Sequence, residues 1–273
     1  SGADLDIQSK IGNSSGSSSG LTKSGAGLLK LSGANTYTGP TTVNAGTLQL
    51  YGGGGLLYPY TGTVSIAAGA TLRNSSSANF QMNGALSGSG TLQTDTDANA
   101  YTVVSAASSF TGPIVVQAGI FQLAYTGTLG SAGTYAGAIS ASSGTQVRLW
   151  SNTALTFSGV LSGAGQFNLG GGNGTVTLTG TNTYTGDTVI STSNLLISGT
   201  GVLGSGNYAG QITLCPTLVY SSSTDQVLSG AIIGGFCTSG AISKSGSSTL
   251  TLSGTNTYGG TTTVSGGRLN ING

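Results

Sequence analysis

The sequence is organised around a segment that recurs along its length. Residues 21–50 read LTKSGAGLLKLSGANTYTGPTTVNAGTLQL, and residues 242–271 read ISKSGSSTLTLSGTNTYGGTTTVSGGRLNI, at the same length and without a gap. Between them lie a third segment over 175–197, TVTLTGTNTYTGDTVISTSNLLI, and a weaker one over 108–123, SSFTGPIVVQAGIFQL. We call these segments copies 1 to 4 in chain order. Their aromatic residues are spaced by 73, 74 and 74 positions, and such a fixed period is typical of a repeat architecture.

The sequence between the copies repeats as well. The LSGSG of residues 86–90 matches the LSGAG of residues 161–165, and YAGAI at 135–139 matches YAGQI at 208–212. The repeat unit is therefore about 74 residues long. Its approximate boundaries give a partial unit over 1–50, followed by units over 51–123, 124–197 and 198–271. Because one pattern fills the chain, we expect a single domain over 1–273.

Apolar residues alternate with polar ones inside each unit, as at Leu29 and Leu31 or Val176 and Leu178. Short alternating runs bounded by Gly, Asn and Ser predict half-buried β-strands. A sandwich would not preserve the period, and propeller blades are shorter than this unit. The pattern therefore predicts an all-β parallel β-helix, or β-solenoid, of about 11–15 coils at roughly 20–25 residues per coil. The side chains expected to point inward are Leu29, Leu31, Val43, Leu48 and Leu50.

The run GxLxLSGxNTYTGxTTVxxGxLxL resembles the autotransporter-associated β-strand repeat, also called the passenger-associated transport repeat. It lies at Leu28–Leu50, Thr175–Ile197 and Thr249–Ile271, and in weaker form at Ser108–Leu123. The resemblance implies a right-handed parallel β-helix, an extracellular or bacterial cell-surface location, and a role as an adhesin or a fibre.

Charge and composition exclude several partners. The formal net charge is +1, charged residues make up 5% of the chain, and the basic residues are spread along it. Nothing in this pattern favours nucleic-acid binding. No apolar run approaches the roughly 18 residues of a membrane-spanning helix, so we expect no membrane insertion of this segment.

The acidic residues give little support for catalysis. The chain contains six Asp or Glu residues and no histidine, which removes the commonest general base. Asp95 and Asp97 are the only acidic pair at strand spacing near mid-chain, but the stretch lacks the glycine and closing glutamate of a calcium loop. A solvated turn is the stronger interpretation. We expect no enzyme activity, no cofactor and no metal site.

Cys215 and Cys237 are the only cysteines. In an exported protein such a pair predicts a disulfide, with buried free thiols as the alternative. A bridge would close a loop of about 22 residues and contribute roughly 3 kcal/mol.

Asn and Tyr recur at matched positions of the strong copies, at Asn35 and Tyr37, Asn182 and Tyr184, and Asn256 and Tyr258. These side chains could contact a glycan, but Asn is suited to turns and a recurrent aromatic usually packs between coils. We therefore expect structural turn positions. Aromatics outside the motif, Trp150, Tyr58 and Tyr60, are better candidates for contact with a ligand.

Both ends of a solenoid expose unpaired backbone groups unless they are capped. The N-terminal and C-terminal strands both follow the 74-residue repeat. Between the point of the repeat where the chain ends and the point where it begins, about one coil is missing. Either the chain is a fragment of a longer rod, or its ends form a head-to-tail interface. The residues expected at that interface are Asp4, Leu5, Asp6, Ile7, Leu269, Asn270 and Ile271.

The sequence is compatible with three functions. The favoured one is a secreted structural solenoid that stacks head to tail with copies of itself in a surface fibre. The second is an adhesin passenger segment that binds glycan or a host surface. The third, a polysaccharide-acting enzyme, is the least favoured because of the sparse acidic residues.

Overall fold

The structure is a computed structural model that describes residues 4–56, 58–237 and 239–272. The chain divides into two compact units, Ser1–Ala132 and Gly133–Gly273. In the described residues every regular element is a strand except the 3-10 turn η1 (Gly204–Gly206). Within this part of the chain, no helix is long and apolar enough to cross a membrane.

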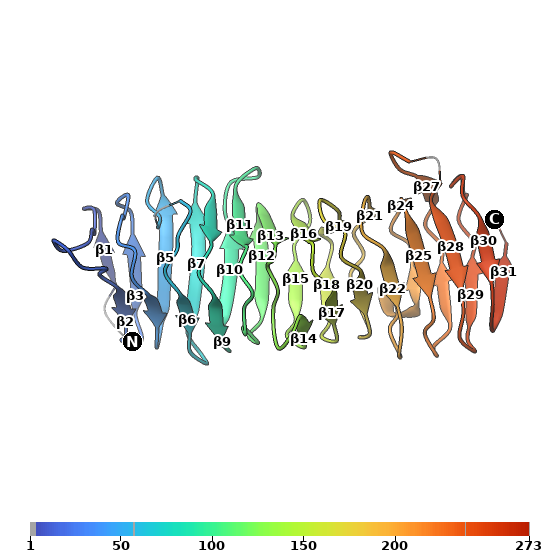
Figure 1. Cartoon of the computed structure of the whole chain (residues 1–273), viewed down its shortest axis with the longest axis horizontal. Coiled ribbons are helices and arrows are strands. Elements are labelled where there is room, and N and C mark those ends of the chain that lie inside the picture. The colour runs from blue at the N-terminus through green and yellow to red at the C-terminus, as the bar shows by residue number, and fades with distance from the viewer. Residues whose placement is uncertain (1–3, 57, 238, 273) are drawn as a thin grey trace. The chain divides into compact units, whose positions relative to one another are not determined.

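The first unit contains three parallel sheets, whose strands stack side by side in Figure 1. The β1–β12 sheet comprises β1 (Leu5–Ile7), β3 (Leu28–Leu31), β5 (Thr47–Gly52), β7 (Thr71–Ser76), β10 (Thr91–Asp95) and β12 (Ile114–Ala118). The β2–β9 sheet comprises β2 (Leu21–Lys23), β4 (Thr41–Val43), β6 (Val64–Ile66) and β9 (Leu86–Gly88). The β8–β13 sheet comprises β8 (Phe80–Met82), β11 (Tyr101–Val104) and β13 (Ile120–Tyr125).

The second unit contains four parallel sheets. The β15–β18 sheet pairs β15 (Ile139–Ala141) with β18 (Leu161–Gly163). The β16–β27 sheet comprises β16 (Gln146–Ser151), β19 (Gln166–Leu169), β21 (Thr188–Ile190), β24 (Ile212–Leu214) and β27 (Ile232–Gly234). The β14–β30 sheet comprises β14 (Thr134–Tyr135), β17 (Leu155–Phe157), β20 (Val176–Leu178), β22 (Leu195–Ile197), β25 (Thr217–Tyr220), β28 (Ala241–Lys244) and β30 (Thr262–Val264). The β23–β31 sheet comprises β23 (Asn207–Tyr208), β26 (Gln226–Leu228), β29 (Thr249–Leu252) and β31 (Arg268–Ile271).

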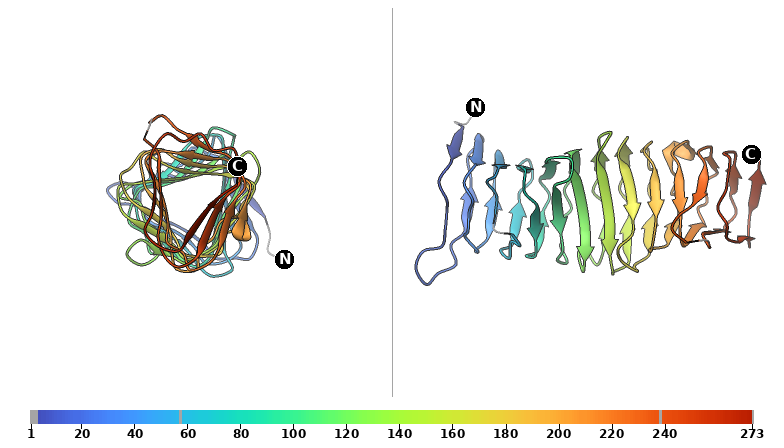
Figure 2. Two further views of the ribbon diagram at one scale, coloured as in Figure 1. Left: turned by 90° about the vertical axis from the view of Figure 1, so that its right-hand side faces the viewer. Right: turned by 90° about the horizontal axis from the view of Figure 1, so that it is seen from above.

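Each turn of the chain passes through three sides before returning to the first. In the first unit Leu5 pairs with Leu29, Leu29 with Leu48, and Leu48 with Leu72. The length of a turn therefore agrees with the roughly 20–25 residues expected for one coil. The two units together contain about 12 turns, which confirms the predicted all-β solenoid. The end-on view in Figure 2 shows the last turn of the second unit, in dark red, as a three-sided ring.

Alternation along the strands places every second side chain in the interior. Of the five residues predicted to point inward, Leu29 is 9% exposed and the other four are fully buried. Glycine is required where a strand ends in a sharp corner. Gly88 and Gly163 close equivalent strands with φ of +97° and +93°, and a Cβ there would lie about 2.0 Å from a carbonyl oxygen of the neighbouring turn.

The repeat unit does not contain a whole number of turns. In the first unit Leu31 of copy 1 lies in the β1–β12 sheet, whereas Val104, at the equivalent position of the next repeat, lies in the β8–β13 sheet. In the second unit Leu178 lies in the β14–β30 sheet, and Leu252 lies in the β23–β31 sheet. About 74 residues thus correspond to roughly three and one third turns. The boundary after Ala132 falls inside a repeat unit, and the single domain over 1–273 stays a prediction.

Candidate functional site

The recurrent asparagines tie consecutive turns together. Asn182 Oδ1 accepts a hydrogen bond from the Leu161 amide in the preceding turn (3.0 Å). Its Nδ2 donates to Gly180 O (2.9 Å) and to Val202 O in the following turn (3.1 Å). Asn35 makes the equivalent three bonds in copy 1. Because all of the side-chain polar atoms are used within the fold, these asparagines act as rungs between turns and are not available to a ligand.

The recurrent tyrosines form a buried hydroxyl chain. Tyr37 Oη lies 2.9 Å from Thr41 Oγ1, which lies 2.7 Å from Tyr60 Oη, and Tyr60 donates to Gly39 O. Copy 3 repeats the arrangement with Tyr184, Thr188 and Tyr208 at 2.8 Å for both hydroxyl contacts. Burial raises the pKa of Tyr184 to about 12 and the pKa of Tyr37 well above its usual value. We call this arrangement the Tyr–Thr–Tyr chain.

Two lysines are buried at equivalent positions of copies 1 and 4. Lys23 donates to Gly25 O and, at 3.0 Å, to Ala45 O of the next turn. Lys244 donates to Ser245 O, to Gly246 O (3.1 Å) and to Gly266 O of the next turn (3.3 Å). Desolvation by burial lowers the pKa of Lys244, and the charge of Asp225 opposes that shift. Neither lysine is free to recruit an anionic ligand.

The acidic residues predicted at the N-terminal interface bind within the fold. Asp4 Oδ1 accepts from the Leu28 amide (2.9 Å), and Asp6 accepts from Ser32 Oγ (2.7 Å). The Ser32 hydrogen bond, together with the charge of Lys30, holds the pKa of Asp6 below its usual value. Both aspartates therefore fasten β1 to the next turn, while Leu5 of the same strand remains 58% exposed.

The C-terminal turn lacks a covering layer among the described residues. All three residues of β30 are exposed, Val264 to 49%, and Ile271 of β31 is 61% exposed. Tyr258 Oη lies 2.7 Å from Thr262 Oγ1, which is the first half of a Tyr–Thr–Tyr chain. Leu269 and Asn270 are half-buried because they pair only with β29.

The cysteines lie in neighbouring turns of the second unit. The structure joins Cys215, directly after β24, to Cys237, which follows β27, and their Cα atoms are 5.8 Å apart. Since β24 and β27 are paired strands, the bridge links consecutive turns on one side of the unit.

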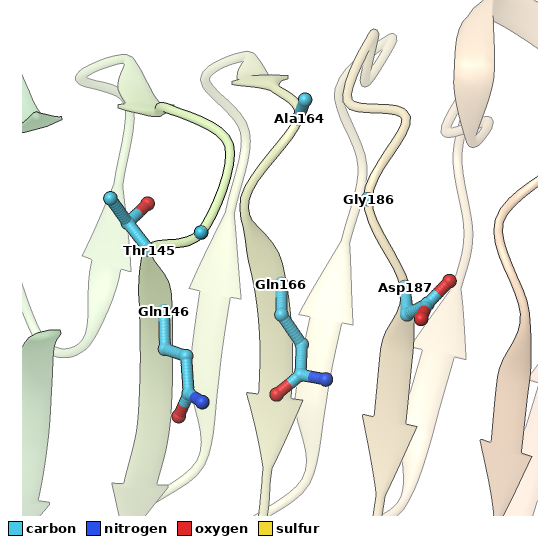
Figure 3. Close-up of a pocket in the computed structure, with 7 residues that line it drawn as sticks. Thr145, Gln146, Ala164, Gln166, Gly186 and Asp187 are labelled. Carbon is cyan, nitrogen blue, oxygen red and sulfur yellow. The ribbon is translucent and has the colours of Figure 1, made fainter. Parts of the chain in front are cut away.

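A shallow depression crosses the outer surface of the β16–β27 sheet (Figure 3). Gln146 on β16, Gln166 on β19 and Asp187 just before β21 line it, and its volume is about 400 Å³. Asp187 Oδ1 accepts from the Gln211 amide (2.9 Å), and Gln146 Oε1 accepts from Arg148 Nε (2.9 Å). The depression thus offers amide and carboxylate groups but is not lined by an aromatic side chain.

A second depression lies on the outer surface of the first unit, with a volume of about 320 Å³. Tyr51 on β5 and Arg73 on β7 line it, together with Asp95 and Asp97. Arg73 forms an ion pair with Asp95. Asp97 opens a turn that is closed by a hydrogen bond from Ala100 N to Asp97 O (2.9 Å). This arrangement fits the solvated turn rather than a calcium loop. In the described residues no three His, Cys, Asp or Glu side chains form a group that could hold a metal ion.

The aromatic residues singled out as ligand contacts differ in their surroundings. Tyr60 is fully buried in the Tyr–Thr–Tyr chain, so its assignment to a ligand surface is wrong. Trp150 donates from Nε1 to Asn168 Oδ1 (3.2 Å) and packs beside Gly171. Tyr58 is 56% exposed.

Two features escaped the sequence reasoning. One is the burial of Lys23 and Lys244, although their shared place in the LTKSG and ISKSG motifs was a usable signal. The other is the clustering of Lys30, Tyr51 and Arg73, which lie on three successive turns and meet only through the register of those turns.

Comparison with known families supports the repeat pattern. Residues 21–50, 171–192 and 242–271 match the family described as Passenger-associated-transport-repeat. No curated protein and no solved structure is detectably similar to the chain. The predicted resemblance is confirmed for these three segments, and the repeats and the solenoid fit an autotransporter passenger-like domain.

Proposed function

We propose that this chain is a structural building block of an extracellular surface fibre, formed when β-solenoid copies stack head to tail. The observation that carries the proposal is that the last described turn leaves inward motif positions open to a further turn, which a second copy, or a continuation of the same rod, would supply. Ile271 and Val264 are 61% and 49% exposed, whereas Ile197 and Ile190, at the same motif positions of copy 3, are fully buried. Another turn laid on this surface would bury both apolar side chains and pair the open strand edges.

The order of the three sides assigns the contacts of such a junction. In the second unit the segment 256–258 continues the side of β27, since Thr257 N donates to Ile232 O (2.8 Å), and β30 and β31 follow it. The next strand after β31 would therefore return to the first side and pair with the segment 256–258. In a stacked second copy, β1 would cover that segment and β2 would pair with β31. This refines the expectation that β1 itself meets β31.

The family match supports a surface or secreted location for the fibre. The proposal gives the chain no catalytic role, because each of its two i,i+2 acidic pairs has a member in an ion pair, Asp6 with Lys30 and Asp95 with Arg73. A role as an adhesin passenger is the second candidate, favoured by the polar and aromatic depression around Tyr51.

The test is electron microscopy and sedimentation of the 273-residue chain beside two variants. Leu269→Lys with Ile271→Lys places charges on inward positions of the last turn and should leave monomers. Thr263→Lys adds a charge to the outer surface of that turn and should still form fibres. Cysteines at 21 and 269 should crosslink neighbouring copies, whereas cysteines at 5 and 269 should not. An unmodified chain that stays monomeric at high concentration would contradict the proposal.

A further inference from the structure

Charged side chains and an exposed tyrosine gather on one outer surface of the first unit. Charged residues make up only 5% of the sequence. On neighbouring strands of the β1–β12 sheet, however, they gather around one exposed tyrosine (strands β1 to β10 in Figure 1). The residues of this surface are Asp6, Lys30, Tyr51, Arg73 and Asp95, followed by Asp97.

The other copies show that the fold needs neither a lysine at the position of Lys30 nor an aromatic residue at the position of Tyr51. The position of Lys30 is occupied by Thr177 in copy 3 and by Thr251 in copy 4. The position of Tyr51 is occupied by Ser198 after copy 3. The equivalents of β3 in those copies, β20 and β29, are also short strands, and Thr177 and Thr251 lie at their outward positions. Lys30 and Tyr51 are therefore not required for the solenoid to form.

The tyrosine is held in place from one side. Lys30 Nζ lies 3.8 Å from the centre of the Tyr51 ring and 3.4 Å from an Asp6 carboxylate oxygen. Because β5 lies between β3 and β7, Lys30 supports the ring on the β3 side, and the depression of about 320 Å³ opens toward β7 and β10. Tyr51 is 45% exposed, so its apolar surface is accessible beside fixed polar groups.

The polar groups of the depression suit a ligand that carries many hydroxyl groups. The Arg73 guanidinium donates hydrogen bonds, the Asp97 carboxylate accepts them, and the Gln49 amide keeps an acceptor oxygen while its Nε2 donates to Ser75 Oγ (3.1 Å). A sugar ring offers C–H groups that can pack on an aromatic face and hydroxyls that both donate and accept. The volume falls within the range of roughly 300–1,000 Å³ common for small-molecule sites.

We infer that this depression binds a saccharide unit of a neutral glycan, with Tyr51 as the stacking platform. Charge balance sets the class of glycan. Asp6 neutralises Lys30 and Asp95 neutralises Arg73, which leaves the Asp97 carboxylate to repel acidic sugars. The site lies on the outer surface rather than on the strand edges, so it does not depend on the proposed fibre, and a monomeric chain would bind glycan equally well.

The test is a glycan array of neutral, amino-sugar and uronic-acid oligosaccharides probed with the 273-residue chain, followed by calorimetric titration of the best neutral oligosaccharide. Tyr51→Ala should weaken binding about tenfold or more. Tyr125→Ala removes a tyrosine that is 63% exposed on β13 of the same unit, and it should leave affinity unchanged.

Circular dichroism of both variants should match that of the unmodified chain, which separates a binding defect from misfolding. Three results would overturn the inference. They are retention of acidic oligosaccharides alone, an equal loss of affinity in the two variants, and an array on which no neutral oligosaccharide is retained.

Discussion

Copies 3 and 4 carry nearly the same motif, yet within residues 4–56, 58–237 and 239–272 only copy 3 of the two has a turn on either side. Asn182 bonds to the preceding and the following turn, and the Tyr–Thr–Tyr chain of copy 3 is complete. Asn256 accepts from Ile232 N in the preceding turn (3.0 Å) and donates to Gly254 O in its own (2.7 Å). The motif therefore specifies the strands and corners, while the burial that stabilises them comes from the next turn.

The largest expected difference between the copies concerns a buried charge. Ile197→Asp should lower the free energy of unfolding by more than about 3 kcal/mol, because the carboxylate would be buried without a partner. Ile271→Asp should change it by less than about 0.5 kcal/mol in the monomer, because that side chain is exposed. Denaturant unfolding below the concentration of assembly measures both. Equal losses would mean that the last turn is covered.

The disulfide tests how far copy 4 depends on the turns beneath it. Replacing both Cys215 and Cys237 by Ser should cost roughly 3 kcal/mol, from the loop of about 22 residues. Hydrogen exchange should rise more in copy 4 than in copy 3, since the bridge joins the turns just before copy 4. Non-reducing mass spectrometry of the unmodified chain should show the loss of two daltons. Two freely alkylated thiols would remove the basis of this prediction.

A smaller difference is expected for single hydroxyl groups. Tyr184→Phe should destabilise the chain by about 1 kcal/mol, because it leaves the buried Thr188 hydroxyl with one partner fewer. Tyr258→Phe should have an effect near zero, since the hydroxyl groups of Tyr258 and Thr262 are exposed to solvent. Thermal melts of the two variants make a matched pair, and a larger loss for Tyr258→Phe would reverse the comparison.

The smallest effect is expected from pH between about 3 and 9. Stability changes with pH only where proton binding differs between folded and unfolded states, and the carboxyl of Asp6, whose pKa is lowered, is exposed. Above this range several buried tyrosines, whose pKa values are raised, act against Lys244, whose lowered pKa shifts stability in the opposite direction, and the tyrosines set the sign by their number. The pKa of Tyr184 rises from 10.0 to about 12 on burial, so its contribution is complete below pH 10 and is lost as pH rises through about 12.

Melting temperatures at pH 4, 7, 9 and 11 check this expectation, and Tyr184→Phe should reduce the alkaline loss. A drop of tens of degrees between pH 7 and pH 4 would instead point to an essential carboxylate network.

Local pattern was enough to predict much of the fold. Alternation placed Leu31 and Leu50 inward correctly. Asn35 and Asn182 are predicted as structural turn positions from their turn chemistry, and their side chains form hydrogen bonds within the fold. Contacts between turns could not be read in the same way. The pairing of Thr41 with Tyr60, and of Lys30 with Tyr51, depends on turn lengths that differ from one turn to the next, and the sequence does not mark where each turn closes.

The mismatch between repeat length and turn length has a consequence for how such chains can change. Gain or loss of one whole repeat would keep every strand in register. It would also rotate all outward side chains downstream of it by about one third of a turn around the solenoid axis. Gain or loss of three repeats would restore the original orientation of those side chains around the axis. A binding patch such as the one around Tyr51 could therefore be re-aimed by duplication upstream of it, with no substitution in the patch itself.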